Sequence, residues 1–176
     1  MTTPPRILTI AGSDSSGGAG IQADIKTITM LGGYAMSAIT AITAQNTQGV
    51  SAVEALSGEL VLEQMAACIE DIGVDAVKIG MLGSEDIVCH VAAGLVAAPE
   101  IGARSVRGHA ARNPPPGVGR MPIVLDPVMV ATSGSLLASN PVIDAMRARL
   151  FPLATVLTPN LPELEVLGGA DIRSLG

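Results

Sequence analysis

The sequence has almost no aromatic side chains: its 176 residues include no tryptophan, one tyrosine and one phenylalanine. Proteins that bind single-stranded nucleic acids stack bases on aromatic rings and neutralise phosphates with basic residues. Here 16 acidic residues face 10 basic ones, which gives a formal net charge of −6. The composition therefore argues against nucleic acid as a partner.

Cysteine is scarce as well. The two cysteines, Cys68 and Cys89, do not lie in a Cys-x-x-Cys pair. His90 follows Cys89, but two adjacent ligands do not make a zinc site. We therefore expect both to be reduced cysteines on helix faces.

Long apolar runs are missing too, although 48% of the residues are hydrophobic. A membrane span needs about 20 consecutive apolar residues, and no such run free of charge and glycine occurs. The opening residues, MTTPPR, lack the charged and apolar regions of a signal peptide. We expect a single cytoplasmic domain over residues 1–176, with no membrane partner.

What the sequence does contain is a regular alternation of short apolar runs and stretches of helical periodicity. This alternation predicts a parallel sheet covered on both faces, an α/β three-layer fold. The predicted strands are 6–12, 34–43, 50–56, 75–80, 122–127 and 154–160, and the predicted helices are 18–31, 57–73, 84–98, 139–150 and 161–169.

Ligands of such folds bind beyond the carboxyl ends of the strands. The unusual residues of this sequence, which are glycines, polar residues and one methionine, fall at these ends, so we expect one rim of the sheet to gather them. They are Gly12, Asp14, Gln45, Asn46, Gly80, Met81, Asp126 and Asn160.

One segment, 99–122, interrupts the alternation. It has no periodicity and contains four arginines and three consecutive prolines. Structureless loops of this length are unusual inside a compact domain. We expect a flexible surface insertion; the alternative, a basic arm that contacts phosphates, lacks aromatic partners.

The glycine-rich stretch GSDSSGGAG follows the first predicted strand and invites comparison with phosphate-binding loops. A Walker A loop needs a lysine where Gly18 stands. A dinucleotide-binding loop fits the letters of residues 18–23, but it needs an acid about 20 residues later to bind the ribose. No acid occurs between Asp24 and Glu54, so both comparisons fail.

Two interpretations of the loop remain. Its backbone N–H groups open a helix and could hold polar groups of a small molecule. Alternatively, it is a tight strand-to-helix turn capped by Ser or Asp. Asp24 lies at the edge of the apolar face that Ile21 and Ile28 form, so its carboxylate either caps nothing or points across the rim toward a ligand.

Five blocks of the sequence resemble, in order, the hydroxymethylpyrimidine/phosphomethylpyrimidine kinases of thiamine biosynthesis: LTIAGSDSSGGAGIQADIKT, ITAITAQNTQGV, KIGML, VLDPVMVATSG and LTPNLPE. The likeness runs from Arg6 to about Ala98 and from Ile123 to about Leu167. It implies a ribokinase-like α/β/α domain that uses ATP and Mg²⁺ to phosphorylate a small-molecule pyrimidine, and it allows a homodimer.

The resemblance places the first glycine loop over the phosphoryl acceptor. By motif, the pyrimidine pocket would comprise Gly12, Asp24, Gln45, Met81 and Val128. An aminopyrimidine presents a ring nitrogen acceptor beside an amine donor, and the Gln45 amide is complementary to both. The Asp24 carboxylate can accept an N–H or O–H, and Met81 offers an adaptable apolar face.

The resemblance also assigns Asp126, Asn160 and Glu163 to the nucleotide side, with Asp126 and Glu163 binding Mg²⁺ through water. Hard oxygen ligands suit this cation. The structural alternative makes Asp126, before Pro127, a turn former and Glu163 an acid of a first helical turn.

The sequence departs from the family in the insertion at 99–122 and at its C-terminal end. The family continues beyond the position of Gly176 with a second glycine motif and the residue that activates the substrate hydroxyl. No Gly-Thr-Gly-Cys or Gly-x-Gly-Asp occurs in these 176 residues, so we expect no catalytic residue among them.

The expected fold is therefore incomplete at its C-terminal end, and phosphoryl transfer, which depends on positioning and charge stabilisation, should be impaired. A non-catalytic remnant or weak pyrimidine binder is one alternative function. A pyridoxal-type vitamin kinase is another, although the AGSDSSGGAG opening favours the pyrimidine.

Overall fold

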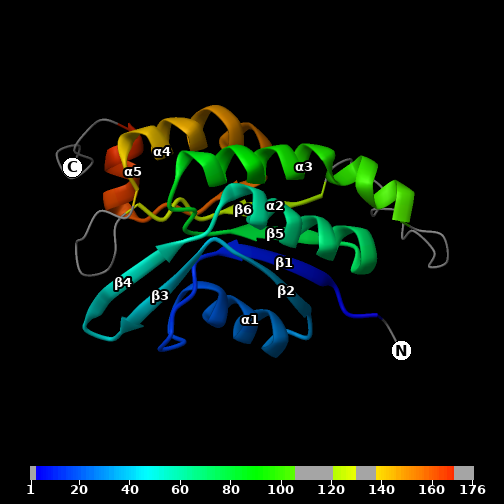
Figure 1. Ribbon diagram of the computed structural model, residues 1–176, viewed down its shortest axis with the longest axis horizontal. Helices are drawn as coiled ribbons and strands as arrows, with labels where there is room; N and C mark the ends of the chain where they lie inside the picture. The colour runs from blue at the N-terminus through cyan, green and yellow to red at the C-terminus, as the bar shows by residue number, and fades with distance from the viewer. Residues whose placement is uncertain (1–2, 106–120, 130–137, 169–176) are drawn as a thin grey trace.

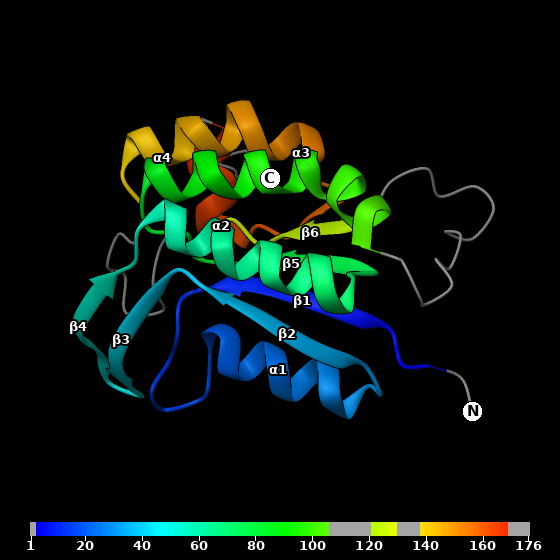
Figure 2. The ribbon, with the colours of Figure 1, turned by 45° about the vertical axis from the view of Figure 1, so that its right-hand side comes forward.

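A five-stranded parallel sheet forms the centre of the computed structural model, which describes residues 3–105, 121–129 and 138–168. Helix α1 (Gly20–Met30) covers one face, and α2 (Gly58–Ala67), α3 (Glu85–Ser105) and α4 (Asn140–Ala145) lie over the other (Figures 1 and 2). The predicted three-layer α/β fold is confirmed. The strand order is β2 (Tyr34–Ile39), β1 (Arg6–Ala11), β5 (Ala76–Ile79), β6 (Ile123–Leu125) and β7 (Val156–Leu157).

The core lies between this sheet and the layer that contains α2 and α3. Alternate side chains of the central strands point into it, because successive side chains of a strand face opposite sides. The helices α2 and α3 approach closely at Gly94, where an added methyl group would lie 2.8 Å from both Leu62 Cδ1 and Met65 Cε. The fully buried core side chains include Leu8, Ile10, Val61, Met65, Val77, Ile79, Ile87, Val88, Val91 and Leu125.

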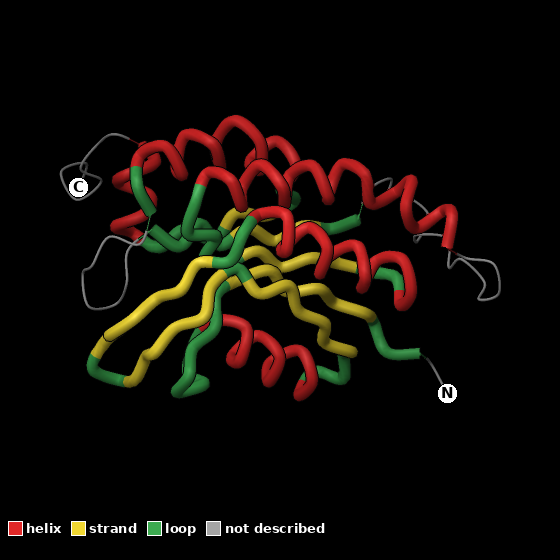
Figure 3. The backbone as a smooth tube through the Cα atoms, viewed as in Figure 1, coloured by secondary structure: helices red, strands yellow, loops and turns green. Residues whose placement is uncertain are grey.

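Residues 34–43 do not form one strand, as the sequence pattern predicts, but two. The chain bends at Thr40, which is buried; its N–H donates to Ala11 O (3.0 Å) and its hydroxyl donates to Met81 O (2.7 Å). Beyond the bend, β3 (Ala41–Asn46) pairs antiparallel with β4 (Gly49–Ala55). This hairpin extends away from the sheet (Figure 3). The prediction is wrong because residues 34–43 contain no glycine or proline to mark the bend, and threonine is itself common in strands.

The helices agree with the predicted ones in position but not always in length. Helix α2 is capped by Ser57, whose hydroxyl accepts the N–H of Leu60 (3.2 Å). Helix α3 continues through Pro99, so the first seven residues of the predicted insertion are helical; residues 106–120 lie outside the described part of the chain. A proline inside a helix lacks a donor and usually ends it, which is why the sequence pattern places the end too early.

The remaining elements are η1 (Cys68–Ile72), η2 (Met146–Leu150), η3 (Phe151–Leu153) and α5 (Leu161–Gly168).

Within residues 3–105, 121–129 and 138–168, none of the helices has the length and apolar character that crossing a bilayer requires.

The glycine-rich loop after β1 is organised by the carboxylate of Asp14, which is only 2% exposed. One oxygen accepts the N–H and the hydroxyl of Ser16 (2.9 and 2.8 Å), and the other accepts the N–H groups of Gly18 and Ala19 (3.0 and 2.8 Å). Burial alone would raise the pKa of Asp14, but these hydrogen bonds outweigh it and hold the pKa below its ordinary value. Of the two interpretations of the loop, the turn capped by its own Asp is therefore the one observed.

The same loop is joined to the hairpin by two serines. The Ser13 hydroxyl accepts the N–H of Thr43 (2.9 Å). The Ser15 hydroxyl donates to Gln45 O (2.7 Å) and lies 2.8 Å from Gln45 N, whose hydrogen it accepts. The loop and β3 are therefore positioned as one unit, although about 30 residues separate them.

Helix α1 starts directly against the end of β1. The Ile21 N–H donates to Gly12 O (3.0 Å), and Gly20 has a φ of +55°. A Cβ at residue 20 would collide with the Gly12 carbonyl oxygen. Glycine is therefore required at residue 20 by both conformation and space.

We expect Asp14→Ala to lower the free energy of unfolding by about 1–3 kcal/mol, since it leaves several backbone N–H groups of the loop without their acceptor. Asp14→Asn, which keeps one carbonyl oxygen, is the matched control and should lose less. Urea denaturation at pH 7 measures both.

The same contribution should depend on pH. Because the folded-state pKa of Asp14 is lowered, the stabilisation is present above the unfolded-state value of about 4 and is lost as the pH falls through the folded-state pKa. The difference between wild type and Asp14→Ala should therefore narrow at acid pH. A difference that stays constant from pH 7 to pH 3 would contradict this account.

Candidate functional site

The candidate site lies where the carboxyl ends of the central strands meet. Since β1, β5 and β6 are neighbours in the parallel sheet, the residues that follow them lie along one edge. Gly12 follows β1, Met81 follows β5 and Asp126 follows β6. The glycine-rich loop and the hairpin are attached at this end of the sheet, as Figure 2 shows.

Gly12 and Met81 are in close contact. A methyl group added at Gly12 would lie 2.5 Å from Met81 Cε, so a larger residue here would displace the end of the Met81 side chain. The Met81 carbonyl accepts the Thr40 hydroxyl, which fixes the backbone at the end of β5. The Met81 side chain is half-buried and presents an apolar surface beside the loop.

Gln45 lies within β3 of the hairpin and not beyond the second strand of the sheet, where the sequence pattern places it. Its backbone is held by Ser15. Its side-chain oxygen lies 3.5 Å from the Thr43 hydroxyl, which is too long for a strong hydrogen bond, and in the described part of the chain its amide nitrogen has no partner. A half-buried amide thus keeps both a donor and an acceptor for a ligand.

Asp24 is bound to the sheet beneath α1. Its Oδ2 accepts the Thr9 hydroxyl (2.6 Å) and lies 3.1 Å from Lys78 Nζ. Thr9 and Lys78 are register partners on β1 and β5, so both point toward the same face. The sequence analysis offers two alternatives for Asp24, a carboxylate without a capping role and a carboxylate that points toward a ligand. Neither alternative anticipates these internal partners.

Lys78 also connects Asp24 with Asp126, whose Oδ2 lies 3.9 Å from Lys78 Nζ. Burial raises the pKa of Asp126 above its ordinary value, Lys78 counters this, and the nearby charges of Glu163 and Asp24 raise the pKa further. The Val128 N–H donates to the backbone carbonyl of Asp126 (2.8 Å), which forms a tight turn after β6.

Asn160 and Glu163 form a reciprocal cap at the start of α5. Asn160 Oδ1 accepts the Glu163 N–H (3.0 Å), and Glu163 Oε2 accepts the Asn160 N–H (3.0 Å). The other Glu163 oxygen accepts the Met129 N–H (3.2 Å), and the residue is only 2% exposed. Both Glu163 oxygens are therefore occupied by backbone donors, which favours the structural interpretation of this residue.

The carboxylates of the site suit a metal ion that keeps much of its water. Across residues 3–105, 121–129 and 138–168, no three side chains of His, Cys, Asp or Glu are close enough to enclose a metal. Mg²⁺ usually binds through one or two carboxylates together with water and substrate phosphates. Asp126, whose side chain is 35% exposed, fits that mode, whereas the buried and occupied Glu163 fits it less well.

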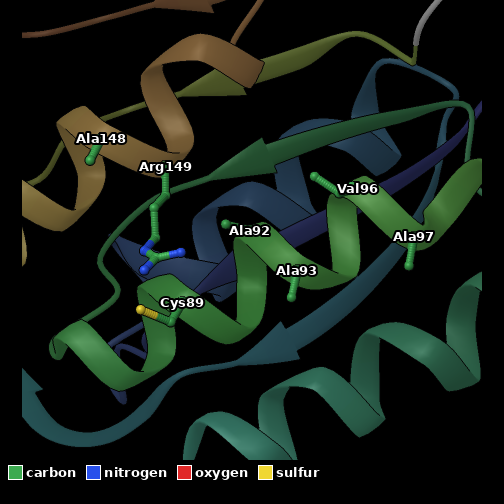
Figure 4. Close-up of a pocket in the computed structure, with 7 residues that line it drawn as sticks. All are labelled: Cys89, Ala92, Ala93, Val96, Ala97, Ala148 and Arg149. Carbon is green, nitrogen blue, oxygen red and sulfur yellow. The ribbon is translucent and has the colours of Figure 1, made fainter.

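A shallow hollow on the opposite helical layer is not part of this site (Figure 4). Its lining is mostly small and apolar and contains no carboxylate, and its polar side chains are Cys89 and Arg149. Cys89 lies there, and both cysteines are free and lie on helices, as predicted; burial raises the pKa of Cys68. The hollow is lined by Cys89, Ala92, Ala93, Val96, Ala97, Ala148 and Arg149.

Two residues of the site escape the sequence analysis, Thr9 and Lys78. Both lie inside strands, which are recognised in a sequence by their apolar residues and not by the polar residues between them. The sequence signal for Lys78 is a charged residue between two apolar ones, Val77 and Ile79, which are buried. A lysine on a central strand faces away from such neighbours and needs a charged or polar partner on its own side of the sheet.

Comparison with known sequences points to one family. The sequence profile of the phosphomethylpyrimidine kinases matches residues 14–103 and 116–176 and leaves out 104–115, in the middle of the predicted insertion. The hydroxymethylpyrimidine/phosphomethylpyrimidine kinase of Mycobacterium leprae is 43% identical over 171 residues, which cover 97% of this chain and 54% of that protein. The corresponding kinase of Rhizobium meliloti is 47% identical over 165 residues, 94% of this chain and 54% of that protein.

Solved structures agree with the sequences. The phosphomethylpyrimidine kinase of Clostridium difficile 630 superimposes with a TM-score of 0.79 at 43% identity, over 96% of this chain and 64% of that one. An ADP complex of Bacillus subtilis pyridoxal kinase gives a TM-score of 0.74 at 35% identity, over 96% and 55%.

The chain spans about half the length of the curated relatives named above. The two parts of the profile match cover most of the chain and include most of the glycine-rich loop, the hairpin and the later strands. The chain therefore belongs to the phosphomethylpyrimidine kinase family.

Proposed function

We propose that this chain forms the acceptor-binding part of a kinase that phosphorylates 4-amino-5-hydroxymethyl-2-methylpyrimidine and its monophosphate with ATP in thiamine biosynthesis. The observation that carries the proposal is the Gln45 amide, whose backbone is fixed by Ser15 while its side-chain nitrogen has no partner among the described residues. An amide in this state can pair with the ring nitrogen and the amine of an aminopyrimidine at once.

The other predicted pocket residues complete the acceptor side of the proposal. Met81, packed on Gly12, supplies an apolar surface for the ring. Asp24 accepts the substrate hydroxyl or amine with its remaining lone pairs, and Val128 closes the pocket beyond Asp126. The loop amides of Ser16, Gly18 and Ala19 have no part in this pocket, since Asp14 already occupies them.

On the nucleotide side we propose that Asp126 binds Mg²⁺ through water. Magnesium neutralises the charge of the phosphates when it is bound. Asn160 and Glu163 support the site from the start of α5 by fixing the backbone of Met129 and of α5 itself.

The alternative acceptor is pyridoxal. Solved pyridoxal kinases of Bacillus subtilis and of Staphylococcus aureus superimpose with TM-scores of 0.74 and 0.72, at 35% and 36% identity. The phosphomethylpyrimidine kinase of Clostridium difficile 630 is more similar in both measures. Pyridoxal also lacks the amine beside a ring nitrogen that would use both ends of Gln45, so we favour the pyrimidine.

We expect Gln45→Ala to reduce the affinity for hydroxymethylpyrimidine by about 1–3 kcal/mol, because it leaves the polar edge of the ring without a partner. Gln48→Ala is the matched control, since Gln48 is an exposed amide at the tip of the same hairpin. Titration calorimetry with hydroxymethylpyrimidine and with pyridoxal measures both variants. Equal losses in the two variants would remove Gln45 from the pocket, and tighter binding of pyridoxal would favour the alternative acceptor.

A second prediction concerns turnover. These 176 residues contain neither Gly-Thr-Gly-Cys nor Gly-x-Gly-Asp, the motifs expected to stabilise the transferred phosphate. Loss of a single oxyanion donor commonly lowers a rate by about 10²–10³. We therefore expect the 176-residue chain to phosphorylate hydroxymethylpyrimidine at least about 100-fold more slowly than a fusion that continues after Gly176 with the C-terminal part of the Rhizobium meliloti relative.

The assay is ATP-dependent phosphorylation by the two purified proteins. Comparable turnover would contradict the expectation. A fusion that folds and binds the pyrimidine but transfers no phosphate would favour the non-catalytic remnant over the kinase.

A further inference from the structure

We propose that Lys78 is a positioning residue that divides its charge between Asp24 on the acceptor side and Asp126 on the nucleotide side, so that it strengthens pyrimidine binding and weakens metal binding. The assignment of the two sides rests on the proposed function. The geometry of the lysine does not.

Lys78 occupies an unusual place for a charged residue. It lies on β5, the middle strand of the sheet, between the buried residues Val77 and Ile79. Its side chain is 27% exposed and passes over the face of the sheet that α1 covers. Lysine at such a position is rare unless it is paired.

The ammonium group lies at the carboxyl ends of the strands because a glycine makes room for it. A methyl group added at Gly80 would lie 3.0 Å from Lys78 Nζ and 3.1 Å from Ala11 Cβ. Both distances are tighter than nine in ten real Cβ contacts. Gly80, which is buried, thus permits the lysine to reach the gap between the ends of β1 and β6.

Two carboxylates from different elements meet the ammonium there. Asp24 reaches it from α1 at 3.1 Å and Asp126 from the end of β6 at 3.9 Å. In the described part of the chain, no other Lys or Arg forms an ion pair with either carboxylate. Lys78 is therefore the cation that balances this group of charges.

The unequal distances give the two carboxylates different dependence on Lys78. Asp24, 18% exposed, is held between the ammonium and the Thr9 hydroxyl, which fixes its orientation toward the acceptor. Asp126 has the longer contact and is more exposed, so a divalent cation that binds it must act against the positive charge of Lys78. Removal of that charge should therefore affect the two sides in opposite directions.

A purely structural role predicts something else. If Lys78 only joined α1 to the sheet, its loss would lower stability and weaken both sides together or neither. Opposite changes in the two affinities are thus the readout that separates positioning from simple support.

The test uses Lys78→Gln, which keeps a hydrogen-bond donor but loses the charge. Binding of hydroxymethylpyrimidine is measured by calorimetry, and binding of Mn²⁺, as the probe for Mg²⁺, by electron paramagnetic resonance without nucleotide. We expect the Kd for the pyrimidine to rise by about 3- to 10-fold and the Kd for Mn²⁺ to fall by about 3-fold or more, the range of a partly screened charge contact.

Two further variants sharpen the result. Asp24→Asn releases Lys78 toward Asp126, so it should weaken both pyrimidine and Mn²⁺ binding. Arg149→Gln removes one positive charge from the hollow on the opposite layer and should change neither affinity. Urea denaturation of each variant reports its stability separately.

The proposal is overturned if Lys78→Gln changes both affinities in the same direction, or leaves both unchanged while stability falls. Loss of folded protein in both Lys78→Gln and Lys78→Met would also overturn it, because Lys78 would then be a requirement of the fold. If the wild type fails to bind hydroxymethylpyrimidine, the proposed function fails and takes with it the acceptor half of the role of Lys78. The Mn²⁺ comparison still tests the other half, because an unchanged or higher Kd for Mn²⁺ in Lys78→Gln would show that Lys78 does not oppose metal binding.

Discussion

The buried carboxylate of Asp14 is the interaction on which the rest of the acceptor side depends. Its four hydrogen bonds give the glycine-rich loop a single shape. That shape brings Gly12 against the start of α1 and places Ser13 and Ser15 beside the hairpin. The loop thereby adds to the contacts that hold α1, which carries Asp24, and β3, which carries Gln45, against the sheet. The glycine-rich loop resembles a phosphate-binding loop in sequence, but the carboxylate of Asp14 accepts its N–H groups in place of a phosphate.

The two faces of the sheet contact their helices through different kinds of side chain. Toward α2 and α3, the buried side chains of the central strands are apolar, and close packing such as that at Gly94 holds the layers together. Toward α1, Thr9 and Lys78 present polar groups at neighbouring positions of β1 and β5. An apolar layer provides stability, and a polar layer that ends at the strand termini provides chemistry. The division follows from the period of two along each strand.

The sequence is sufficient to predict the architecture because strand and helix periods are written in consecutive residues. The strands at 6–12 and 75–80 and the helix at 57–73 lie close to β1, β5 and α2. Long-range hydrogen bonds have no such signature. The bend at Thr40 depends on Ala11 and Met81, and it moves Gln45 from the sheet to the hairpin. The N–H groups of the glycine-rich loop likewise point to the Asp14 carboxylate, and the sequence pattern does not specify where that side chain lies.

The partners of Lys78 are a second example of long-range contacts that the sequence does not predict. The alternation of β5 tells that residue 78 faces away from Val77 and Ile79, but only the fold brings Asp24 and Asp126 to that face. Glu163 shows how two interpretations can both suit a sequence. Its place in a first helical turn is evident from the chain, whereas the donation from the Met129 N–H, 34 residues away, is not.

The hydrogen bonds of Ser15 to the hairpin end on the main chain of residue 45 and not on its side chain. The attachment of the hairpin and the ligand recognition that we propose for Gln45 therefore use different parts of one residue. A substitution of the side chain leaves the main-chain hydrogen bonds to Ser15 in place. Such a separation lets selectivity change by single substitutions while the scaffold is inherited intact. It offers a physical reason why vitamin kinases named for a pyrimidine and for pyridoxal superimpose on this chain with TM-scores of 0.79 and 0.74.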